Sequence, residues 1–455
     1  MAQVTEKKVV DFTKGNPTRH ILSFFVPLLL TSMLQQVYNF VDVLIVGKGL
    51  GDNALASVGN MGSIFFLIVG FSVGLANGFG VLIAQSFGAK KYDELRHRIA
   101  ATLQLAVGIT ALLTFVSLTF LDEILILMQT NEALMANCLK YGYIIYGGLV
   151  ASISFNVSAA VLRALGDSRT PLKAIVISSI VNLVLDCLFI FVIHMGVSGA
   201  AFATVLSQLV SAHICIRQLR KIDIIALKAS DFKNGKDVYL TLVKNGLPMA
   251  FMNSITAIGC MVVQYFVNGY GVSYTTAYTA CSKYINLFIN PACTAGNTMS
   301  AFTSQNYGAK EYGRIKYGLK VCLMIAFVSY VVLGMLLVFM PEFLAGILID
   351  GEEAIRLACE FLPLCGMAMI VVDCLFVFRS GVQGMGKPVL PMWSGVVEMV
   401  LRIVIISCLM GSIGFRAAAL AEISAWCGAL LINIYAFGRI LIPQLKLSYM
   451  KKSPV

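Results

Sequence analysis

Long apolar runs, separated by short polar segments, follow one another along almost the whole chain. A helix needs about 20 mostly apolar residues to cross the hydrocarbon core of a bilayer. The alternating apolar and polar positions of membrane-spanning strands are absent from the sequence, so the pattern predicts helices. Twelve spans are expected, near residues 20–47, 54–83, 97–120, 134–164, 170–194, 198–219, 240–268, 275–303, 314–340, 353–385, 388–409 and 412–440.

Composition agrees with an all-α membrane protein. Only 13% of the 455 residues are charged and 58% are hydrophobic, whereas soluble domains carry about 25% charged residues. The net charge of +11 does not require a nucleic-acid partner, because most of the 34 Lys and Arg residues fall in alternate connections between spans. This positive-inside pattern predicts a multi-pass protein of the plasma (inner) membrane with both termini cytoplasmic. Membrane lipids are its expected surroundings, and we expect a monomer.

Cysteine and histidine give no sign of a cofactor or a structural metal site. The 12 Cys residues are scattered without a CxxC pair, and the 4 His residues show no metal-ligand spacing. Small buried apolar side chains are the better interpretation of the cysteines. Residues 1–20 are polar and lead to the first span without a cleavage site, so that span is expected to be a retained anchor.

A repeat divides the chain into two halves. Residues 85–92 read QSFGAKKY and residues 305–312 read QNYGAKEY, 220 positions further on. The same spacing separates Gly49 from Gly269, Gly51 from Gly271, Gly166 from Gly386 and Pro171 from Pro391. Self-similarity at one period indicates a duplicated unit. Because each copy holds six spans, an even number, both copies enter the membrane from the same side as parallel repeats.

The repeat defines the predicted organisation. Parallel six-helix lobes that rock against each other, with a substrate path between them, are typical of a transporter. The expected parts are a cytoplasmic N-terminal segment at 1–19, an N-lobe with helices 1–6 at 20–219, a cytoplasmic linker at 220–239, a C-lobe with helices 7–12 at 240–440 and a cytoplasmic tail at 441–455.

No nucleotide site is found to power such a transporter. In GMGKPV at 384–389, Pro388 stands where a phosphate-binding loop has the Ser or Thr that holds magnesium. The sequence also lacks the clustered His, Asp and Ser residues of a membrane enzyme. The energy is therefore expected to come from an ion gradient or from the substrate's own gradient.

Few charged residues lie deep within the predicted spans, and each is costly in hydrocarbon unless it faces protein, water or a partner. They are Asp42, Asp186, Lys283, Asp373, Glu398, Arg402 and Glu422. Asn182 and Asp186 share one face of span 5, because they are four residues apart. Counted from the outer ends of their spans, Asp42, Asp186 and Thr204 lie at similar depths. The sequence predicts a polar pocket in the outer half of the membrane, with Asn156 of span 4 facing it.

Such a pocket suits cation coupling. Burial disfavours the charged form of a carboxyl group, and a second carboxylate nearby adds to this, so a buried pair can carry a proton near neutral pH. Carboxylate, amide and hydroxyl oxygens also ligate hard cations such as Na⁺. The predicted cation-coupling residues are Asp42, Asn182, Asp186, Thr204 and Asn156, and the first four are the predicted Na⁺ ligands. Hydrogen bonding between helices is the alternative role of Asn182 and Thr204.

The second half carries a different set of charges. Glu398 and Arg402 are four residues apart on span 11 and are expected to pair with each other. Lys283 of span 8 and Asp373 of span 10 are candidates for a contact across the half. Glu422 of span 12 corresponds, at an offset of 218, to the threonine of the polar pocket in the first half.

Several stretches together resemble one transporter family. In the first half they are PLLLTSMLQQVYNFVDVLIVGKGLGDNALASVG at 27–59, QSFGAKKY at 85–92, VLRALGDSRTP at 161–171 and NLVLDCLFIF at 182–191. In the second half they are NPACTAGNTMSAFTSQNYGAK at 290–310 and GVQGMGKP at 381–388. On these stretches the chain resembles the multidrug and toxic compound extrusion (MATE) transporters over residues 15–440.

The resemblance implies twelve helices in two six-helix lobes arranged as a V, with alternating access. It also implies export of cationic amphipathic compounds in exchange for H⁺ or Na⁺. The family's N-lobe cation site would comprise Asp42, Asn182, Asp186 and Thr204, and Asp373 would be a further functional position. Some members carry a glutamate on helix 7 or 8, but spans 7 and 8 here contain no acid. Coupling is therefore expected to run through the N-lobe, as in the branch without a helix 7 glutamate.

The resulting expectation is a secondary-active multidrug exporter that is not an enzyme and needs no cofactor besides its coupling ion. Its substrates would be small cationic or amphipathic molecules. The substrate cavity is predicted between the lobes, with Tyr38, Phe155, Lys283 and Asp373 as its candidate residues. A flippase for lipid-linked precursors is the alternative among transporters. An ion channel or a membrane enzyme is the alternative from another class.

Overall fold

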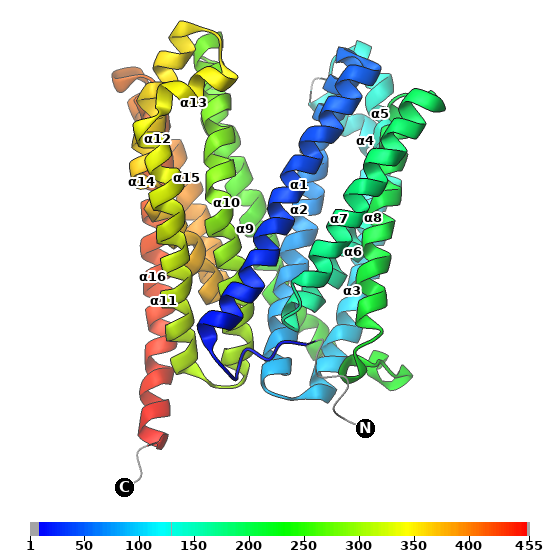
Figure 1. The fold of residues 1–455 in the computed structure, drawn as a ribbon, viewed down its shortest axis with the longest axis vertical. Coiled ribbons are helices and arrows are strands. Elements are labelled where there is room, and N and C mark those ends of the chain that lie inside the picture. Colours follow the sequence, from blue (N-terminus) through cyan, green and yellow to red (C-terminus); the bar gives the residue numbers. More distant parts are fainter. Residues whose placement is uncertain (1–8, 129, 453–455) are drawn as a thin grey trace. The chain divides into compact units, whose positions relative to one another are not determined.

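The computed structural model describes residues 9–128 and 130–452, and these residues are almost entirely helical (Figure 1). No strand occurs within these ranges, and most of the helices are long and apolar. The predicted fold class, an all-α membrane protein, is thereby confirmed. Residues 1–8 of the predicted N-terminal segment and residues 453–455 of the predicted tail lie outside the described residues.

The chain forms two compact units, each of which is considered by itself. The N-terminal unit comprises Met1–Asp11 and Val26–Gly246, and the C-terminal unit comprises Phe12–Phe25 and Leu247–Val455. Two helices therefore contribute residues to both units, one around residue 25 and one around residue 246. The lobe boundaries expected from the sequence, 20–219 and 240–440, rest on the repeat alone and stay a prediction.

Eight α-helices and three short segments of other helix types make up the first part of the described chain. They are α1 (Pro17–Leu50), α2 (Asp52–Gly88), α3 (Tyr92–Thr119), α4 (Leu121–Leu127), α5 (Glu132–Gly147), α6 (Leu149–Ala164), α7 (Arg169–Asp186), the π-helix η2 (Cys187–Val192), α8 (Val197–Leu219) and the 3₁₀ turns η3 (Asp223–Ile225) and η4 (Ala229–Phe232). The 3₁₀ turns lie in the predicted linker between the lobes.

The remaining part has the same organisation. It contains α9 (Lys236–Asn268), α10 (Val272–Gly308), α11 (Tyr312–Ser329), the π-helix η5 (Tyr330–Gly334), α12 (Met335–Phe339), α13 (Pro341–Leu348), α14 (Glu352–Gly384), α15 (Val389–Ile413) and α16 (Arg416–Lys452). Each long helix covers one of the spans predicted from hydropathy. The tail predicted from residue 441 onward continues α16 as far as Lys452.

Ten described helical segments are long and apolar enough to cross a membrane, and a bent pair, α5 and α6, makes eleven. The twelfth predicted span is α10, which has 37 residues but is too polar for this criterion. Several polar side chains in its second half are turned into the protein, since Thr294, Thr298, Gln305 and Asn306 are all buried. A helix shielded by its neighbours does not need the hydropathy of a lipid-facing one.

The bend between α5 and α6 lies where the chain passes close to α8. The two helices meet at 45° beside Gly148. A Cβ atom on Gly148 would lie only 2.4 Å from Cγ2 of Val205 on α8, so a side chain at this position would collide with the neighbouring helix. The predicted span 134–164 is therefore two helices that pass α8 at close range.

The repeat is visible in the backbone as well as in the sequence. Residues with positive φ occur in matching turns: Gly51 (82°) and Gly271 (112°), Lys90 (58°) and Lys310 (61°), Gly166 (82°) and Gly386 (73°), and Gly196 (63°) and Gly414 (63°). Left-handed backbone is uncommon outside glycine, so its recurrence at corresponding places supports a duplicated fold. The last pair is separated by 218 residues, and the other three by 220.

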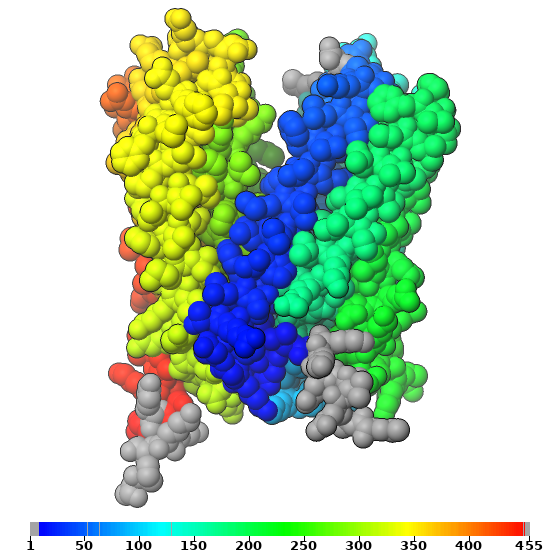
Figure 2. Space-filling view, viewed as in Figure 1, coloured from blue at the N-terminus to red at the C-terminus, as the bar shows by residue number. Residues whose placement is uncertain are grey.

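The outer faces of the helices carry large apolar side chains. On the faces seen in Figure 2, the side chains of α1, α7 and α8 cover the N-terminal unit, and those of α11 to α13 cover the C-terminal unit. Phe115 on α3, Val192 on η2 and Phe339 on α12 are all more than 60% exposed. Such exposure suits contact with lipid chains, because hydrocarbon does not penalise apolar surface as water does.

One close helix contact of the N-terminal unit is between backbones. A Cβ atom on Gly78 of α2 would lie 2.4 Å from Cα of Gly246 on α9, and one on Gly246 would lie 2.7 Å from Cε1 of Phe79. The two small residues let Nδ2 of Asn245 donate to the Gly78 carbonyl at 2.6 Å. Small residues commonly permit such close approach between membrane helices.

We predict that Gly78→Ala lowers the Tm of the purified protein. The added methyl group meets backbone rather than a flexible side chain, so the two helices must separate, at a cost of about 1–3 kcal/mol. Gly59→Ala is the matched control on the same helix, because a Cβ atom there meets nothing within 4 Å. Its Tm should be unchanged or higher, since Ala favours helix by about 1 kcal/mol over Gly. Equal Tm changes in both variants would contradict the packing interpretation.

Candidate cation-coupling site

The structure brings four predicted coupling residues together inside the N-terminal unit. Asp42 lies on α1, Asn182 and Asp186 lie on α7, and Thr204 lies on α8. With its amide nitrogen facing Asp186, Asn182 donates to Asp186 Oδ2 at 2.7 Å, and its amide oxygen accepts from the Thr204 backbone N–H at 3.3 Å. The amide therefore joins α7 to α8 and holds the Asp186 carboxyl group in place.

Asp186 occupies a special position in its helix. It is the last residue of α7, and the chain continues as the π-helix η2. Its side chain is 0% exposed, and that of Asn182 one turn earlier is 1% exposed. Short π-helical segments often mark functional sites, because the wider turn re-aims side chains that a regular α-helix would direct elsewhere.

The two carboxyl groups of the site require neutralisation. Those of Asp42 and Asp186 lie within hydrogen-bonding reach of each other. The Oδ1 atom of each is buried and has no hydrogen-bond partner. Over the described part of the chain, neither acid forms an ion pair with Lys, Arg or His. Asp186 is buried and Asp42 is half-buried, and two such carboxylates without a cation are unfavourable, so a proton shared between them, or a small cation, is the stable arrangement.

Two tyrosine hydroxyl groups complete the polar cluster. Tyr38 on α1 and Tyr141 on α5 lie near both acids and near the Thr204 side chain. Thr204 Oγ1 donates to the Ala200 carbonyl at 3.0 Å, so its lone pairs can accept from a tyrosine. The sequence assigned Tyr38 to the substrate cavity, but its hydroxyl lies beside the acids. Sequence reasoning missed Tyr141, because a tyrosine within an apolar span is usually a core residue.

Asn156 and Phe155 are neighbours on α6 with different surroundings. Phe155 is buried in an apolar cluster that includes Leu162 and Ile175, and its assignment to the substrate cavity stays a prediction. Asn156 is half-buried. None of the hydrogen bonds found among the described residues joins it to the four coupling residues. Its part in the site stays a prediction.

The C-terminal unit contains the other two residues assigned to the substrate cavity. Asp373 on α14 is fully buried, and neither of its carboxyl oxygens has a hydrogen-bond partner. Lys283 on α10 is exposed. No ion pair joins the two residues in the described structure, so the contact suggested by the sequence is not made.

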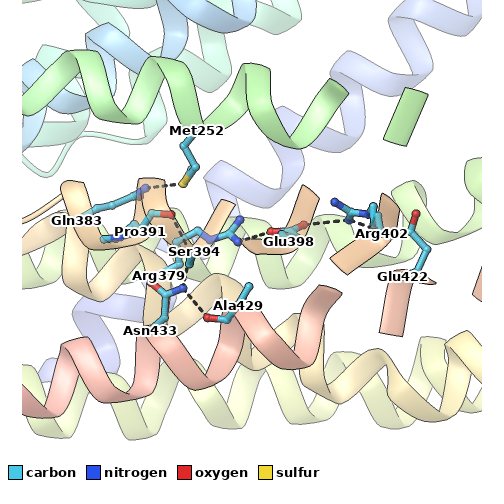
Figure 3. A network of polar contacts seen from close by, with 10 residues as sticks. All are labelled: Met252, Arg379, Gln383, Pro391, Ser394, Glu398, Arg402, Glu422, Ala429 and Asn433. Atoms are coloured by element: carbon cyan, nitrogen blue, oxygen red, sulfur yellow. Dashed lines mark hydrogen bonds and ion pairs between the residues drawn. The ribbon is translucent and has the colours of Figure 1, made fainter. Parts of the chain in front are cut away.

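A row of four charged side chains crosses the interior of the C-terminal unit (Figure 3). The predicted pair is present: Arg402 Nη2 lies 2.9 Å from Glu398 Oε1. Arg379 Nη2 lies 2.6 Å from the other oxygen of Glu398, and Arg402 also binds Glu422 Oε2 through Nε at 3.0 Å. Two cations and two anions alternate along the row, so its formal charge is zero.

Arg379 is a member of this row that the sequence did not single out. It lies near the end of α14, where a basic residue counts toward the positive-inside pattern. Its side chain is buried and paired with Glu398. Positive-inside counting treats each basic residue near the end of a span as part of the loop. A buried partner one helix away leaves no trace in the local sequence.

The chain matches a known family and curated relatives along most of its length. The sequence model of the MatE family matches residues 27–188 and 248–407, one stretch in each half. The probable multidrug resistance protein YoeA of Bacillus subtilis (strain 168) is 29% identical over 372 residues, 79% of each chain. The multidrug export protein MepA of Staphylococcus saprophyticus (strain ATCC 15305) is 22% identical over 392 residues, 84% of this chain and 85% of the relative.

Solved structures agree in fold. A MATE crystallised in the bent conformation has a TM-score of 0.90 at 21% identity, covering 98% of this chain and 100% of that one. An outward-facing multidrug resistance MATE family transporter of the MOP superfamily has a TM-score of 0.87 at 22% identity, covering 99% and 100%. With both halves matched by the family and the fold shared, the chain belongs to the MatE family of multidrug efflux transporters, which are multi-pass membrane proteins and not enzymes.

Proposed function

We propose that the protein is a secondary-active antiporter that exports cationic amphipathic compounds in exchange for H⁺ or Na⁺. The coupling cation would bind at Asp42, Asn182, Asp186 and Thr204. In the cell, the exporter would act in the plasma (inner) membrane as a monomer with both termini cytoplasmic. The relatives named as multidrug resistance and multidrug export proteins support export of drugs.

The observation that carries the proposal is the acid pair of the N-terminal unit, in which Asp186 is buried and Asp42 is half-buried. Asp42 and Asp186 lie within hydrogen-bonding reach of each other, and each keeps one buried oxygen without a partner. Neither acid forms an ion pair among the described residues. The site needs a positive charge, and the chain does not supply one. It is therefore suited to binding a cation from solution.

The donor set fits a proton and also fits Na⁺. A hydrogen bond between two carboxyl groups needs a proton on one of them. Sodium would instead find only hard oxygen donors: the two carboxylates and the hydroxyl groups of Thr204, Tyr38 and Tyr141. The Asn182 oxygen already accepts from the Thr204 N–H, which leaves its carbonyl less available to a metal ion.

Coupling follows if the cation and the drug favour different states of the transporter. A ligand shifts a conformational equilibrium only by the difference between its affinities for the two states. Asp42 is on α1 and Asp186 is on α7, and Tyr141 of α5 lies near both acids, so three helices meet at the acid pair. Neutralising the pair would stabilise the arrangement of these helices in which the two acids are close. Losing the cation would make the acids repel and favour an arrangement in which they are apart.

We predict that Asp186→Asn abolishes coupled export. In proteoliposomes loaded with ethidium, the wild type should export the dye when an inward proton or sodium gradient is imposed. The variant should respond about tenfold less or not at all, since an amide cannot carry the exchanged charge. Asp122→Asn is the control, because the same chemical change is made at an exposed acid on α4. Full gradient-driven export by Asp186→Asn would overturn the assignment.

A second prediction concerns Asp373 in the C-terminal unit. Its carboxyl group is buried with no partner for either oxygen, so a cationic drug would be a suitable counter-charge. Asp373→Asn should weaken the binding of ethidium about tenfold, while binding of an uncharged amphipathic dye stays near the wild-type value. The affinities can be compared by fluorescence titration of purified protein. An equal loss for both dyes would indicate a structural role for Asp373 instead.

A further inference from the structure

The duplicated fold places two pairs of residues at corresponding positions of the two units. Asn182 follows the left-handed Gly166 by the same 16 residues as Arg402 follows Gly386. On the next helix, Thr204 and Glu422 each come 8 residues after a left-handed glycine, at 196 and 414 respectively. Because backbone geometry anchors both alignments, Asn182 corresponds to Arg402 and Thr204 corresponds to Glu422.

Each pair makes a polar contact between the corresponding two helices of its own unit. In the N-terminal unit, the Asn182 amide on α7 meets the Thr204 backbone on α8. In the C-terminal unit, the Arg402 guanidinium on α15 meets the Glu422 carboxylate on α16 at 2.9–3.0 Å. The contact is shared, but the charge differs. The N-terminal pair is neutral and lies beside acids without a cation, whereas the C-terminal pair contains a cation that is part of the chain.

The surroundings of Arg402 also differ from those of Asn182. The position that corresponds to Asp186 is Ile406, which is buried and apolar. The C-terminal acids lie one turn before Arg402, at Glu398, and on α16, at Glu422. Gly259 on α9 makes room for the guanidinium, since a Cβ atom there would lie 3.3 Å from Arg402 Nη1.

Few other groups face this cluster. Arg379 on α14 pairs with Glu398, and the Tyr278 hydroxyl on α10 donates to Glu422 Oε1 at 3.3 Å. The thiols of Cys260 on α9 and Cys365 on α14 lie near Glu422. Arg402 is thus the cation through which both acids are linked. Without it, Arg379 would balance one glutamate and the cluster would carry a net charge of −1.

We propose that Arg402 is a built-in cation that fills a latent cation site in the C-terminal unit. Together with Arg379, its guanidinium balances the charges of Glu398 and Glu422 permanently, whereas Asp42 and Asp186 depend on a cation from solution. The cluster of Glu398 and Glu422 therefore takes up no coupling ion. Removal of the Arg402 charge opens a site for one small monovalent cation between Glu398 and Glu422. The comparison with the N-terminal unit rests on the proposed function, but the latent site can be tested without it.

The experiment uses full-length protein that carries Trp393→Phe and Asp186→Asn. The chain has 2 Trp residues, so the first substitution leaves Trp426, which is 3% exposed and one turn beyond Glu422 on α16, as the local probe. The second disables the proposed N-terminal site. Into this background we introduce Arg402→Gln, the charge-retaining Arg402→Lys, or the charge-balanced pair Arg402→Gln with Glu422→Gln.

Trp426 fluorescence is followed while Na⁺ replaces choline, and separately while the pH is lowered or guanidinium is added. Bound sodium is counted with a radioactive tracer, and proton uptake is counted with a pH indicator. Arg402→Gln should bind about one additional cation per chain, with a saturable fluorescence change, because a buried unpaired carboxylate is strongly destabilising. The Lys variant and the charge-balanced pair should bind none. Identical titrations of Arg402→Gln and the charge-balanced pair would overturn the proposal.

Two further comparisons keep the outcome decisive. If Arg402→Gln does not fold in choline at neutral pH, the proposal predicts that Na⁺, guanidinium or acid restores a monodisperse protein. Failure of all three, while the charge-balanced pair folds, would refute it. The cation counts of chains with and without the Asp186→Asn substitution, both with Arg402 intact, test the proposed function separately. Fewer bound cations in the Asp186→Asn chain than in the chain without it report on the N-terminal site. An additional bound cation in the Arg402→Gln chain reports on the latent site.

Discussion

Neutralisation of buried carboxyl groups is the constraint on which this structure depends. A charged side chain within a membrane-spanning helix is costly unless another charge or a proton compensates it. In the C-terminal unit, Glu398 and Glu422 are compensated within the chain, where Arg379 and Arg402 alternate with them. In the N-terminal unit, Asp42 and Asp186 are not compensated in this way, because they form no ion pair in the described structure. That difference separates a static polar core from a site suited to exchange a cation.

The two units show how one fold can serve both purposes. Matching left-handed turns place Asn182 and Arg402, and likewise Thr204 and Glu422, at corresponding positions. A helix-to-helix polar contact is made at both places. After duplication, a change of side chain at such a place alters the charge balance without altering the backbone. In this view, the asymmetry of the two units concentrates ion exchange in one of them.

Much of this organisation could be predicted from the sequence. Hydropathy located the long helices, the 220-residue repeat divided the chain, and the cost of a lone charge singled out Asp42 and Asp186. The i, i+4 spacing of Glu398 and Arg402 predicted a pair that the structure contains. The features that the sequence did not predict are contacts with partners on other helices. The pairing of Arg379 and the position of Tyr141 beside the acids depend on which helix faces are apposed, which local spacing does not specify.

The most direct test of the account is whether drug binding displaces a cation from the acid pair. Ethidium is added to purified wild-type protein in weakly buffered solution, while a pH indicator and a sodium-selective electrode record the ions released. The account predicts release of about one H⁺ or Na⁺ per bound drug, as reciprocal linkage between the two ligands requires. It also predicts that Asp186→Asn binds the drug without this release. Drug binding to the wild type with no cation released would contradict it.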